Sequence, residues 1–324
     1  MPITRLGLQI PNFTYPGVPD AELFERIAAI ATTAETSGFD SVWVMDHLYQ
    51  IPGVGHRTNA MLEAYTLLGG LAARTARASV GALVTGVTYR NPALVAKMVT
   101  TLDVVSSGRA ILGIGAAWNE DEHAGYGYSF PPAGERFERL EDALRICRAM
   151  FREEAPTVEG RHHSIRAALN FPRPVRPGGP PILIGGMGER KTLRLVARYA
   201  DACNLFGPPD VVRHKLGVLE RHCAEVGRDP AEITKTRLGT LVIASTQEEA
   251  EAKVRMLVRT RGANEEMLRT RALVGGPVRV AEVVGALLDA GLDGLIFNLP
   301  DADDLDTVRL AGHVLCDALG VKAA

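Results

Sequence analysis

The sequence predicts an α/β fold of the (β/α)8 TIM-barrel class with insertions, and three observations favour it. Strand-like runs alternate eight times with helical segments along the chain. These runs are short and almost continuously apolar, as expected for parallel strands that are covered on both faces. The first run leads into Pro11, Asn12 and Phe13, whereas a doubly wound sheet would usually carry a G-x-G-x-x-G segment there.

The expected elements follow one another in a regular order. Strands are expected at residues 5–10, 41–45, 79–85, 110–115, 181–185, 202–206, 238–244 and 293–299. Helices are expected at residues 20–37, 61–74, 92–106, 135–151, 191–200, 210–226, 247–259, 279–290 and 305–319. Asp20 is expected to cap the first helix, which Gly38 ends, and Pro92 stands in a favoured first turn.

Three segments interrupt this alternation. Residues 118–134 are expected to form an irregular, aromatic and glycine-containing insertion. Residues 152–181 are rich in proline, glycine and basic residues, which predicts a long excursion across the barrel with a short hairpin. Residues 261–274 are expected to form a further helical insertion.

Length and composition are compatible with one large barrel. The chain has 324 residues, of which 46% are hydrophobic, so it can form either one barrel or two ordinary domains. No linker rich in serine, glycine or charge interrupts the sequence. We therefore treat residues 1–324 as a single domain.

The charges and the cysteines argue against several classes of function. With 36 basic and 38 acidic residues, no charge excess indicates nucleic acid or a membrane as a partner. The four cysteines show no C-x-x-C pair and no spacing of metal ligands, so we expect them to be reduced and buried and expect no metal site. The first segment reads as a strand instead of a cleavable leader, and no run of about eighteen apolar residues occurs. We expect a cytoplasmic protein that acts on a small-molecule substrate.

The end of the second strand carries the first candidate site. In a parallel barrel the loops after the strands form the rim on which catalytic residues lie. Asp46 and His47 directly follow the second strand. An imidazole there can exchange a proton near neutral pH, and a neighbouring carboxylate can orient it. The alternative is that Asp46 caps a turn and His47 is an ordinary loop residue.

The end of the fourth strand carries the second candidate site. Gly113 and Gly115 precede Asn119 and His123, which are four residues apart. On a helix they would share one face and could hold a planar ring or a phosphate group. Alternatively, His123 and the preceding Glu122 form a solvated surface pair.

The end of the fifth strand carries the third candidate site. Gly185, Gly186 and Gly188 precede an expected helix, and Arg190 and Lys191 add positive charge. Glycines that open a helix expose amide groups toward an anion, so we predict phosphate binding there. A plain glycine turn is the alternative.

The chain also carries four segments whose order is that of a known superfamily. They are SVWVMDH, YRNPALVAK, LDVVSSGRAILGIGAAWNEDEHAGYG and PPILIGGMGERKTLRLVARYADACN. Over residues 3–300 the chain resembles the luciferase-like monooxygenase superfamily, particularly its F420-dependent oxidoreductase branch of actinobacterial type. The resemblance implies a bacterial luciferase-like (β/α)8 barrel that holds a flavin or deazaflavin at the carboxyl ends of its strands.

The resemblance also implies roles for individual residues. Asp46 and His47 match a pair beside the reactive part of the ring, with His47 handling a proton or orienting the substrate and Asp46 orienting His47. Ala82 and Leu83 match a non-proline cis peptide whose bulge supports the back of the ring. The other matches are Thr85 and Gly86 beside the bulge; Asn119, His123 and Tyr126 near the ribityl and phosphate groups; and Gly185, Gly186, Met187 and Gly188 in the phosphate loop.

One position departs from the pattern of the family. Relatives that oxidise sugar phosphates carry a glutamate directly after the G-x-G of the fourth strand, where Ala116 stands here. The resemblance therefore implies another organic substrate, with a reducible C=C, C=N or carbonyl group.

We expect coenzyme F420 as the cofactor, with a hydride passing between its C5 carbon and the substrate and with His47 as the proton donor or acceptor. The alternative cofactor is FMN, which would make the protein a monooxygenase that uses O2. Two further alternatives are a barrel that binds a flavin or deazaflavin without turnover and a barrel without any cofactor. The apolar helices at 61–74 and 92–106 could supply the face of a homodimer.

Overall fold

The computed structural model describes residues 2–321, which form a closed barrel of parallel strands surrounded by helices. The barrel order is β10-β1-β2-β3-β5-β6-β7-β8, and pairing of β10 with β8 closes it. The prediction of a (β/α)8 barrel is confirmed. The barrel strands are β1 (Leu6–Ile10), β2 (Ser41–Val44), β3 (Ser79–Ala82), β5 (Ala110–Gly115), β6 (Ile182–Gly185), β7 (Ala202–Leu205), β8 (Thr234–Ile243) and β10 (Gly294–Asn298).

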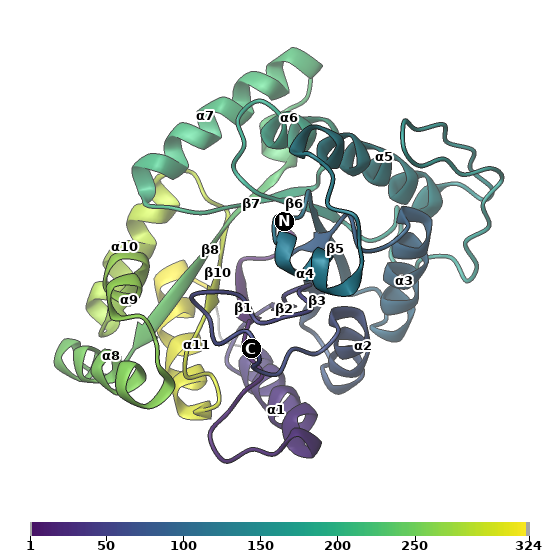
Figure 1. The fold of residues 1–324 in the computed structure, drawn as a ribbon. Helices are drawn as coiled ribbons and strands as arrows, with labels where there is room; N and C mark the ends of the chain where they lie inside the picture. Colours follow the sequence, from purple (N-terminus) through teal and green to yellow (C-terminus); the bar gives the residue numbers. More distant parts are fainter. Residues whose placement is uncertain (1, 322–324) are drawn as a thin grey trace.

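The helices form a ring around these strands, with two helices and one strand added beside β8 (Figure 1). They are α1 (Leu23–Thr36), α2 (Ala64–Arg74), α3 (Pro92–Val105), α4 (Glu120–Tyr126), α5 (Ala133–Arg152), α6 (Thr192–Tyr199), α7 (Pro209–Val226), α8 (Gln247–Arg261), α9 (Glu265–Arg271), α10 (Pro277–Asp289) and α11 (Leu305–Leu319). Within residues 2–321, none of these helices has both the length and the apolar character that crossing a membrane requires.

Local capping explains where several helices begin. At the start of α3 the side chain of Asn91 accepts a hydrogen bond from the Ala93 amide, and Pro92 occupies the first turn. At the start of α8, Thr246 and Glu249 form a capping box. Helix α2 begins three residues after its predicted start because the Glu63 carboxylate caps it, accepting from the Thr66 amide at 2.7 Å.

Two hydrophobic clusters account for the almost continuous apolar strands. One cluster lies inside the barrel and includes Trp43, Ile111, Leu183 and Ile296. A much larger cluster lies between the outer faces of the strands and the helices. The strands β1, β2 and β5 are buried along their whole length, as parallel strands covered on both faces should be.

Four predicted segments differ from the structure. Asp20 lies in a 3-10 turn before α1 and does not cap that helix. The expected irregular insertion contains α4, and the expected hairpin in 152–181 is a single bridge between Val158 and Ile165. The expected helical insertion at 261–274 is wrong in its last residues, because Ala272–Gly275 form strand β9, which pairs with the carboxyl end of β8.

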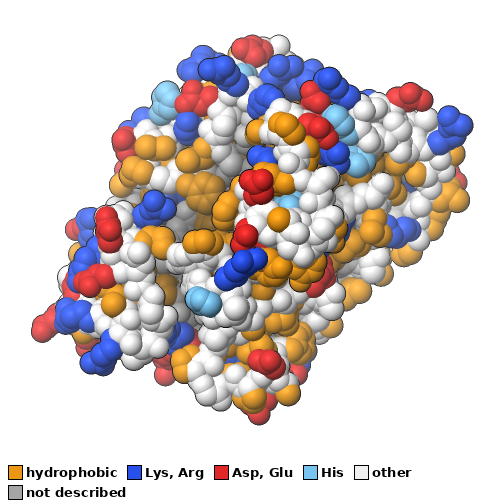
Figure 2. Space-filling view, in the orientation of Figure 1, with side chains coloured by type: hydrophobic (Ala, Val, Ile, Leu, Met, Phe, Trp, Pro, Cys, Tyr) orange, Lys and Arg blue, Asp and Glu red, His pale blue; other side chains and the backbone are white. Residues whose placement is uncertain are grey.

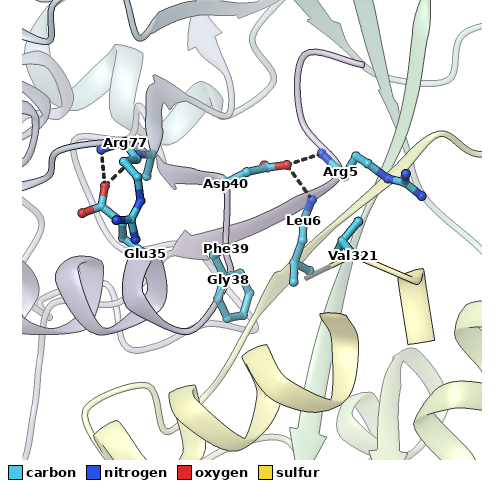
Figure 3. A pocket seen from close by; sticks show the side chains of 9 residues that line it. Arg5, Leu6, Glu35, Gly38, Phe39, Asp40, Arg77 and Val321 are labelled. Atoms are coloured by element: carbon cyan, nitrogen blue, oxygen red, sulfur yellow. Dashed lines mark hydrogen bonds between the residues drawn. The ribbon is translucent and has the colours of Figure 1, made fainter. Parts of the chain in front are cut away.

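A hollow of about 220 Å³ lies at the opposite end of the barrel, beside the amino ends of β1 and β3 (Figure 3). Its two carboxylates already have backbone partners. Glu35 accepts hydrogen bonds from the amides of Ala76, Arg77 and Ala78, and Asp40 accepts from those of Arg5 and Leu6. Such bonds tie the loops to the strands, so these two carboxylates contribute to stability at this end of the barrel.

We expect the substitution Glu35→Ala to lower the free energy of unfolding by about 1–3 kcal/mol, because three amides lose their acceptor. Burial alone would raise the pKa of Glu35, but these amide bonds hold that pKa below its ordinary value. The difference in unfolding free energy between Glu35→Ala and wild type should therefore have its full size near neutral pH and shrink as the pH falls below about 4. Chemical unfolding at several pH values measures it. Arg77→Ala, which keeps its amide, is the control, and an equal loss in that variant would contradict the assignment.

Candidate active site

A cavity of about 440 Å³ lies at the carboxyl ends of the strands. Its walls include residues of β1, β5, β6, β7, β8 and β10 and the residues directly after β2, so segments distant in the sequence converge there. Hydrophobic side chains gather around the hollowed middle of this face in Figure 2. Its lining includes neither lysine nor arginine. The predicted site residues that line it are Asp46, His47, Leu83, Thr85, Gly86, Gly185 and Gly186.

The wall formed by the third strand is interrupted by a bulge. Strand β3 ends at Ala82, and the chain resumes pairing with β5 in the short strand β4 (Thr85–Gly86). A non-proline cis peptide joins Leu83 to Val84, one residue later than the expected position between Ala82 and Leu83. Leu83 and Val84 therefore face the cavity, whereas Ala82 is buried in the strand and does not line it.

The cavity floor beside this bulge is shaped by small residues. A Cβ atom at Gly115 or Gly185 would come within 2.9 Å of the Val84 side chain. The Leu83 carbonyl accepts a hydrogen bond from Gln9 Nε2 at 3.3 Å, and the Leu83 amide donates to the Val44 carbonyl at 2.8 Å. These contacts hold the bulge against its neighbours, and Leu83 and Val84 present apolar side chains to the cavity.

Asp46 is bound to an arginine and not to His47. Arg90 donates to both carboxylate oxygens of Asp46, at 2.8 and 3.0 Å, and the Gly86 amide donates at 3.0 Å. Burial raises the pKa of Asp46, and the guanidinium of Arg90 opposes this rise. The expectation that Asp46 orients His47 is therefore wrong. Asp46 instead connects β2 to the loop after β4 through a buried ion pair.

His47 is oriented by Glu122, which comes from helix α4. His47 Nδ1 lies 2.6 Å from Glu122 Oε1. The other carboxylate oxygen accepts from the Leu48 amide at 3.0 Å and from the Tyr89 hydroxyl at 2.7 Å. Glu122 is fully buried, so the alternative of a solvated surface pair with His123 is excluded.

The charge states of this cluster follow from its surroundings. Burial alone would raise the pKa of Glu122, but the hydrogen bonds from His47, Tyr89 and the Leu48 amide hold it below its ordinary value. The pKa of Tyr89 is raised, first by burial and then by the neighbouring Glu122 carboxylate. Glu122 is thus an ionised acceptor, and Tyr89 is a protonated donor.

Three other predicted residues do not line the cavity. Asn119 caps α4 and donates to Glu122, so it supports the cluster from behind. His123 is fully buried, and its ring nitrogens lie 2.6 Å from Thr88 Oγ1 and 2.7 Å from the Asn119 carbonyl oxygen. Tyr126 is 52% exposed and stacks on Tyr128 at the surface.

The loop after β6 forms one side of the cavity. Gly185 and Gly186 line it together with Thr192 at the start of α6, whereas Met187 and Gly188 do not. Gly186 adopts a φ of 123°, which other residues rarely reach. Beyond this loop, a smaller hollow is lined by two acids on α5, Glu138 and Glu141, and by three cations at or just before the start of α6, Arg190, Lys191 and Arg194.

A second cavity of about 590 Å³ adjoins the first on the other side. The two share Pro11, Val54 and Asn298 in their linings. Residues of α8, α9 and the loop after β1 form half of the second lining, which includes Arg261 and Arg271. Arg261 is already bound to Asp303 by two hydrogen bonds of 2.8 and 2.9 Å.

Several residues of the site were missed by the sequence analysis. Tyr89 and Arg90 lie in the YRNPALVAK segment and Thr192 lies in the segment that contains GERKT, so their position after strand ends could have indicated them. Gln9, Asn204 and Asn298 are polar residues near the ends of β1, β7 and β10, where polar residues on apolar strands are a usable signal. Within residues 2–321, no group of His, Cys, Asp and Glu side chains has the geometry of a metal site.

The sequence matches one family model and is similar to known oxidoreductases. The family model described as luciferase-like monooxygenase matches residues 4–294. The F420-dependent glucose-6-phosphate dehydrogenase of Kineococcus radiotolerans is 30% identical over 301 residues, covering 86% of this chain and 88% of that protein. The phthiodiolone/phenolphthiodiolone dimycocerosates ketoreductase of a Mycobacterium species is 32% identical over 267 residues, covering 76% of this chain and 68% of that protein.

Comparison with solved structures shows the same fold. An F420-dependent secondary alcohol dehydrogenase in complex with an F420-acetone adduct aligns with a TM-score of 0.79 at 20% identity, covering 98% of this chain and 99% of that one. The coenzyme F420-dependent tetrahydromethanopterin reductase of Methanopyrus kandleri aligns with a TM-score of 0.76 at 18% identity, covering 95% of this chain and 97% of that one.

Proposed function

Because this chain belongs to the luciferase-like monooxygenase family, we propose that it is an F420-dependent oxidoreductase that interconverts an alcohol and a carbonyl compound. One observation carries the proposal: His47 and the apolar bulge at Leu83 and Val84 line the same cavity at the carboxyl ends of the strands. A flat ring against the bulge would thereby have a proton-exchanging group beside its substrate.

The residues present fit a deazaflavin. The apolar bulge and the glycines of β5 and β6 line the cavity without projecting side chains at Gly115 and Gly185, which suits a tricyclic ring. Gly185, Gly186 and Thr192 lead from this part of the cavity to the start of α6, where backbone amides favour an anionic group. Arg190, Lys191 and Arg194 stand beyond it and suit the further negative charge of an F420 tail. When bound, the reduced deazaflavin supplies a hydride from its C5 carbon.

The residues of the cavity supply position and a proton. The imidazole of His47 is held by Glu122 and lines the cavity, whereas Tyr89, which also lines it, donates its hydroxyl hydrogen to Glu122. Trp118 packs edge-on against the His47 ring, with centroids 5.5 Å apart, and covers it at the rim. His47 would donate a proton to the oxygen of a carbonyl substrate, or accept one from an alcohol.

The substrate would extend into the second cavity. That cavity adjoins the first at Asn298, and the cofactor ring would not occupy it. It could therefore hold the part of the substrate that does not react. Ala116 stands where sugar-phosphate-oxidising relatives carry a glutamate, and the first cavity is lined by neither lysine nor arginine. We therefore favour an alcohol or ketone over a sugar phosphate.

Parallel spectroscopic titration with F420 and FMN tests the cofactor. We expect F420 to bind at least about tenfold more tightly, equivalent to about 1.4 kcal/mol, because only F420 reaches the cations at α6. A preference for FMN would indicate the alternative, a monooxygenase. Turnover is then assayed with secondary alcohols, ketones and glucose 6-phosphate, and efficient use of the sugar phosphate would contradict the substrate proposal.

A further inference from the structure

We propose that Glu122 is the positioning residue that fixes the tautomer of His47 and so makes Nε2 the atom that exchanges the proton. This inference rests on the proposed function for its chemical meaning, because it concerns the proton that accompanies hydride transfer. Its structural content, the location of a proton on His47, can be tested without cofactor or substrate.

The hydrogen bonds at Glu122 determine which atom carries the proton. The Leu48 amide and the Tyr89 hydroxyl donate to one carboxylate oxygen, and the amide group of Asn119 donates to the other. A carboxylate that receives these donors is ionised and can only accept. The short contact of 2.6 Å to His47 Nδ1 is then a hydrogen bond in which Nδ1 carries the hydrogen.

The second ring nitrogen is left for chemistry. In the part of the chain that the structure describes, His47 Nε2 has no hydrogen-bond partner, although the His47 side chain lines the cavity. Neutral His47 with a proton on Nδ1 carries its free lone pair on Nε2. A buried carboxylate that holds the opposite nitrogen also stabilises the protonated ring after it has accepted a proton.

The other side chains near His47 do not take this role. Asp46 precedes His47 in the chain, but its carboxylate is bound by Arg90 and the Gly86 amide. Tyr89 donates its hydroxyl to Glu122 and thus acts on His47 only through that carboxylate. Trp118 packs on the ring and carries no titratable group. Glu122 is therefore the partner that controls the proton on His47.

An alcohol substrate would lose one proton and one hydride. His47 Nε2 would accept the O–H proton of the alcohol as its C=O bond forms. A bound oxidised deazaflavin would supply the two-electron acceptor for the hydride that leaves the carbinol carbon, so that the substrate would be oxidised by two electrons. In the opposite direction, protonated His47 returns the proton from Nε2 to the carbonyl oxygen.

Nitrogen-15 NMR of the histidine rings, in protein without cofactor, tests the tautomer. The resonance of His47, one of eight histidines, is identified by its loss in His47→Gln. We expect wild-type His47 to carry its proton on Nδ1 with a strongly downfield proton signal. In Glu122→Gln this signal should be lost and the Nε2-protonated form should appear, because the amide cannot accept from every donor that faces it.

Two variants make the result decisive. Glu120→Gln removes the same charge from an exposed position on the same helix, so its His47 spectrum should match that of wild type. If Glu122→Gln does not fold, Glu122→Asp decides: the shorter carboxylate should keep the Nδ1 proton but reduce its downfield shift. A wild-type proton on Nε2, or an unchanged spectrum in the folded Glu122 variant, would overturn the proposal.

Kinetics then connect the tautomer to function. With a substrate identified by the panel, Glu122→Gln should lower the hydride-transfer rate by about 10²-fold. Its affinity for F420 should stay within about twofold, on the order of 0.4 kcal/mol, because Glu122 does not line the cavity. Failure to bind F420 at all would overturn the proposed function but leave the tautomer result standing. Binding with an unaltered rate would instead overturn the role of Glu122 alone.

Discussion

The variant His47→Ala is expected to lose about 10²–10⁴-fold in the rate of hydride transfer, which corresponds to about 3–5 kcal/mol of transition-state stabilisation. Its affinity for F420 should change little, because the bulge and the glycine loops that would hold the ring are intact. Stopped-flow measurement of the cofactor absorbance gives the rate, and fluorescence titration gives the affinity.

A matched control is available in the same loop. His56 is exposed, contacts Thr58 and does not line the cavity, so His56→Ala should keep the wild-type rate. Equal rates in wild type and in His47→Ala would remove His47 from the reaction. Loss of F420 binding in His47→Ala would contradict the expected affinity and show that the imidazole ring contributes to cofactor binding.

The variant Arg90→Leu is expected to lower the free energy of unfolding by about 3–5 kcal/mol. Arg90 is the buried partner of Asp46, and its removal leaves a carboxylate in an apolar environment with one amide donor. Burial alone would lower the pKa of Arg90, but the charges of Asp46 and Glu63 raise it, so the pair is ionised in wild type. Denaturant unfolding measures the loss.

The pH dependence and two further variants identify the cause of this loss. Without Arg90, burial keeps the folded-state pKa of Asp46 above its unfolded-state pKa. The stability of the variant therefore falls as the pH rises from the unfolded-state pKa to the folded-state pKa. The deficit of Arg90→Leu should thus be smaller near about pH 5 than near about pH 8. The double variant Asp46→Asn, Arg90→Leu should recover much of it. Arg74→Leu breaks an exposed pair with Glu25 and should cost far less, and an equal cost there would contradict the argument.

Much of the barrel could be predicted because its signals are local. An apolar run of four to six residues that ends at a glycine or a polar residue indicates a buried strand, and this signal lies within the run itself. The pairs at the ends of these runs, such as Asp46 and His47, could be placed on the rim for the same reason. Strand β9 was missed because its four residues pair with an extension of β8 and carry no alternation of their own.

The candidate site was predicted less completely than the fold. Leu83 and Gly186 were placed correctly at the cavity, but the cis peptide was expected one residue too early, since nothing in the sequence marks which peptide of a bulge is inverted. His123 and Tyr126 were expected near a cofactor from their spacing on a short helix. The structure turns His123 into the interior and leaves Tyr126 at the surface, because spacing does not specify which face of the helix meets the barrel.

The sequence by itself determined the alternation of strands and helices and the position of His47 at a strand end, because these depend on neighbouring residues. Only the tertiary structure decided which carboxylate reaches His47. Glu122 lies 75 residues further along the chain, whereas the adjacent Asp46 turns to Arg90. A hydrogen bond is fixed by distance and direction in space, and folding brings these side chains together across loops whose course the sequence pattern does not specify.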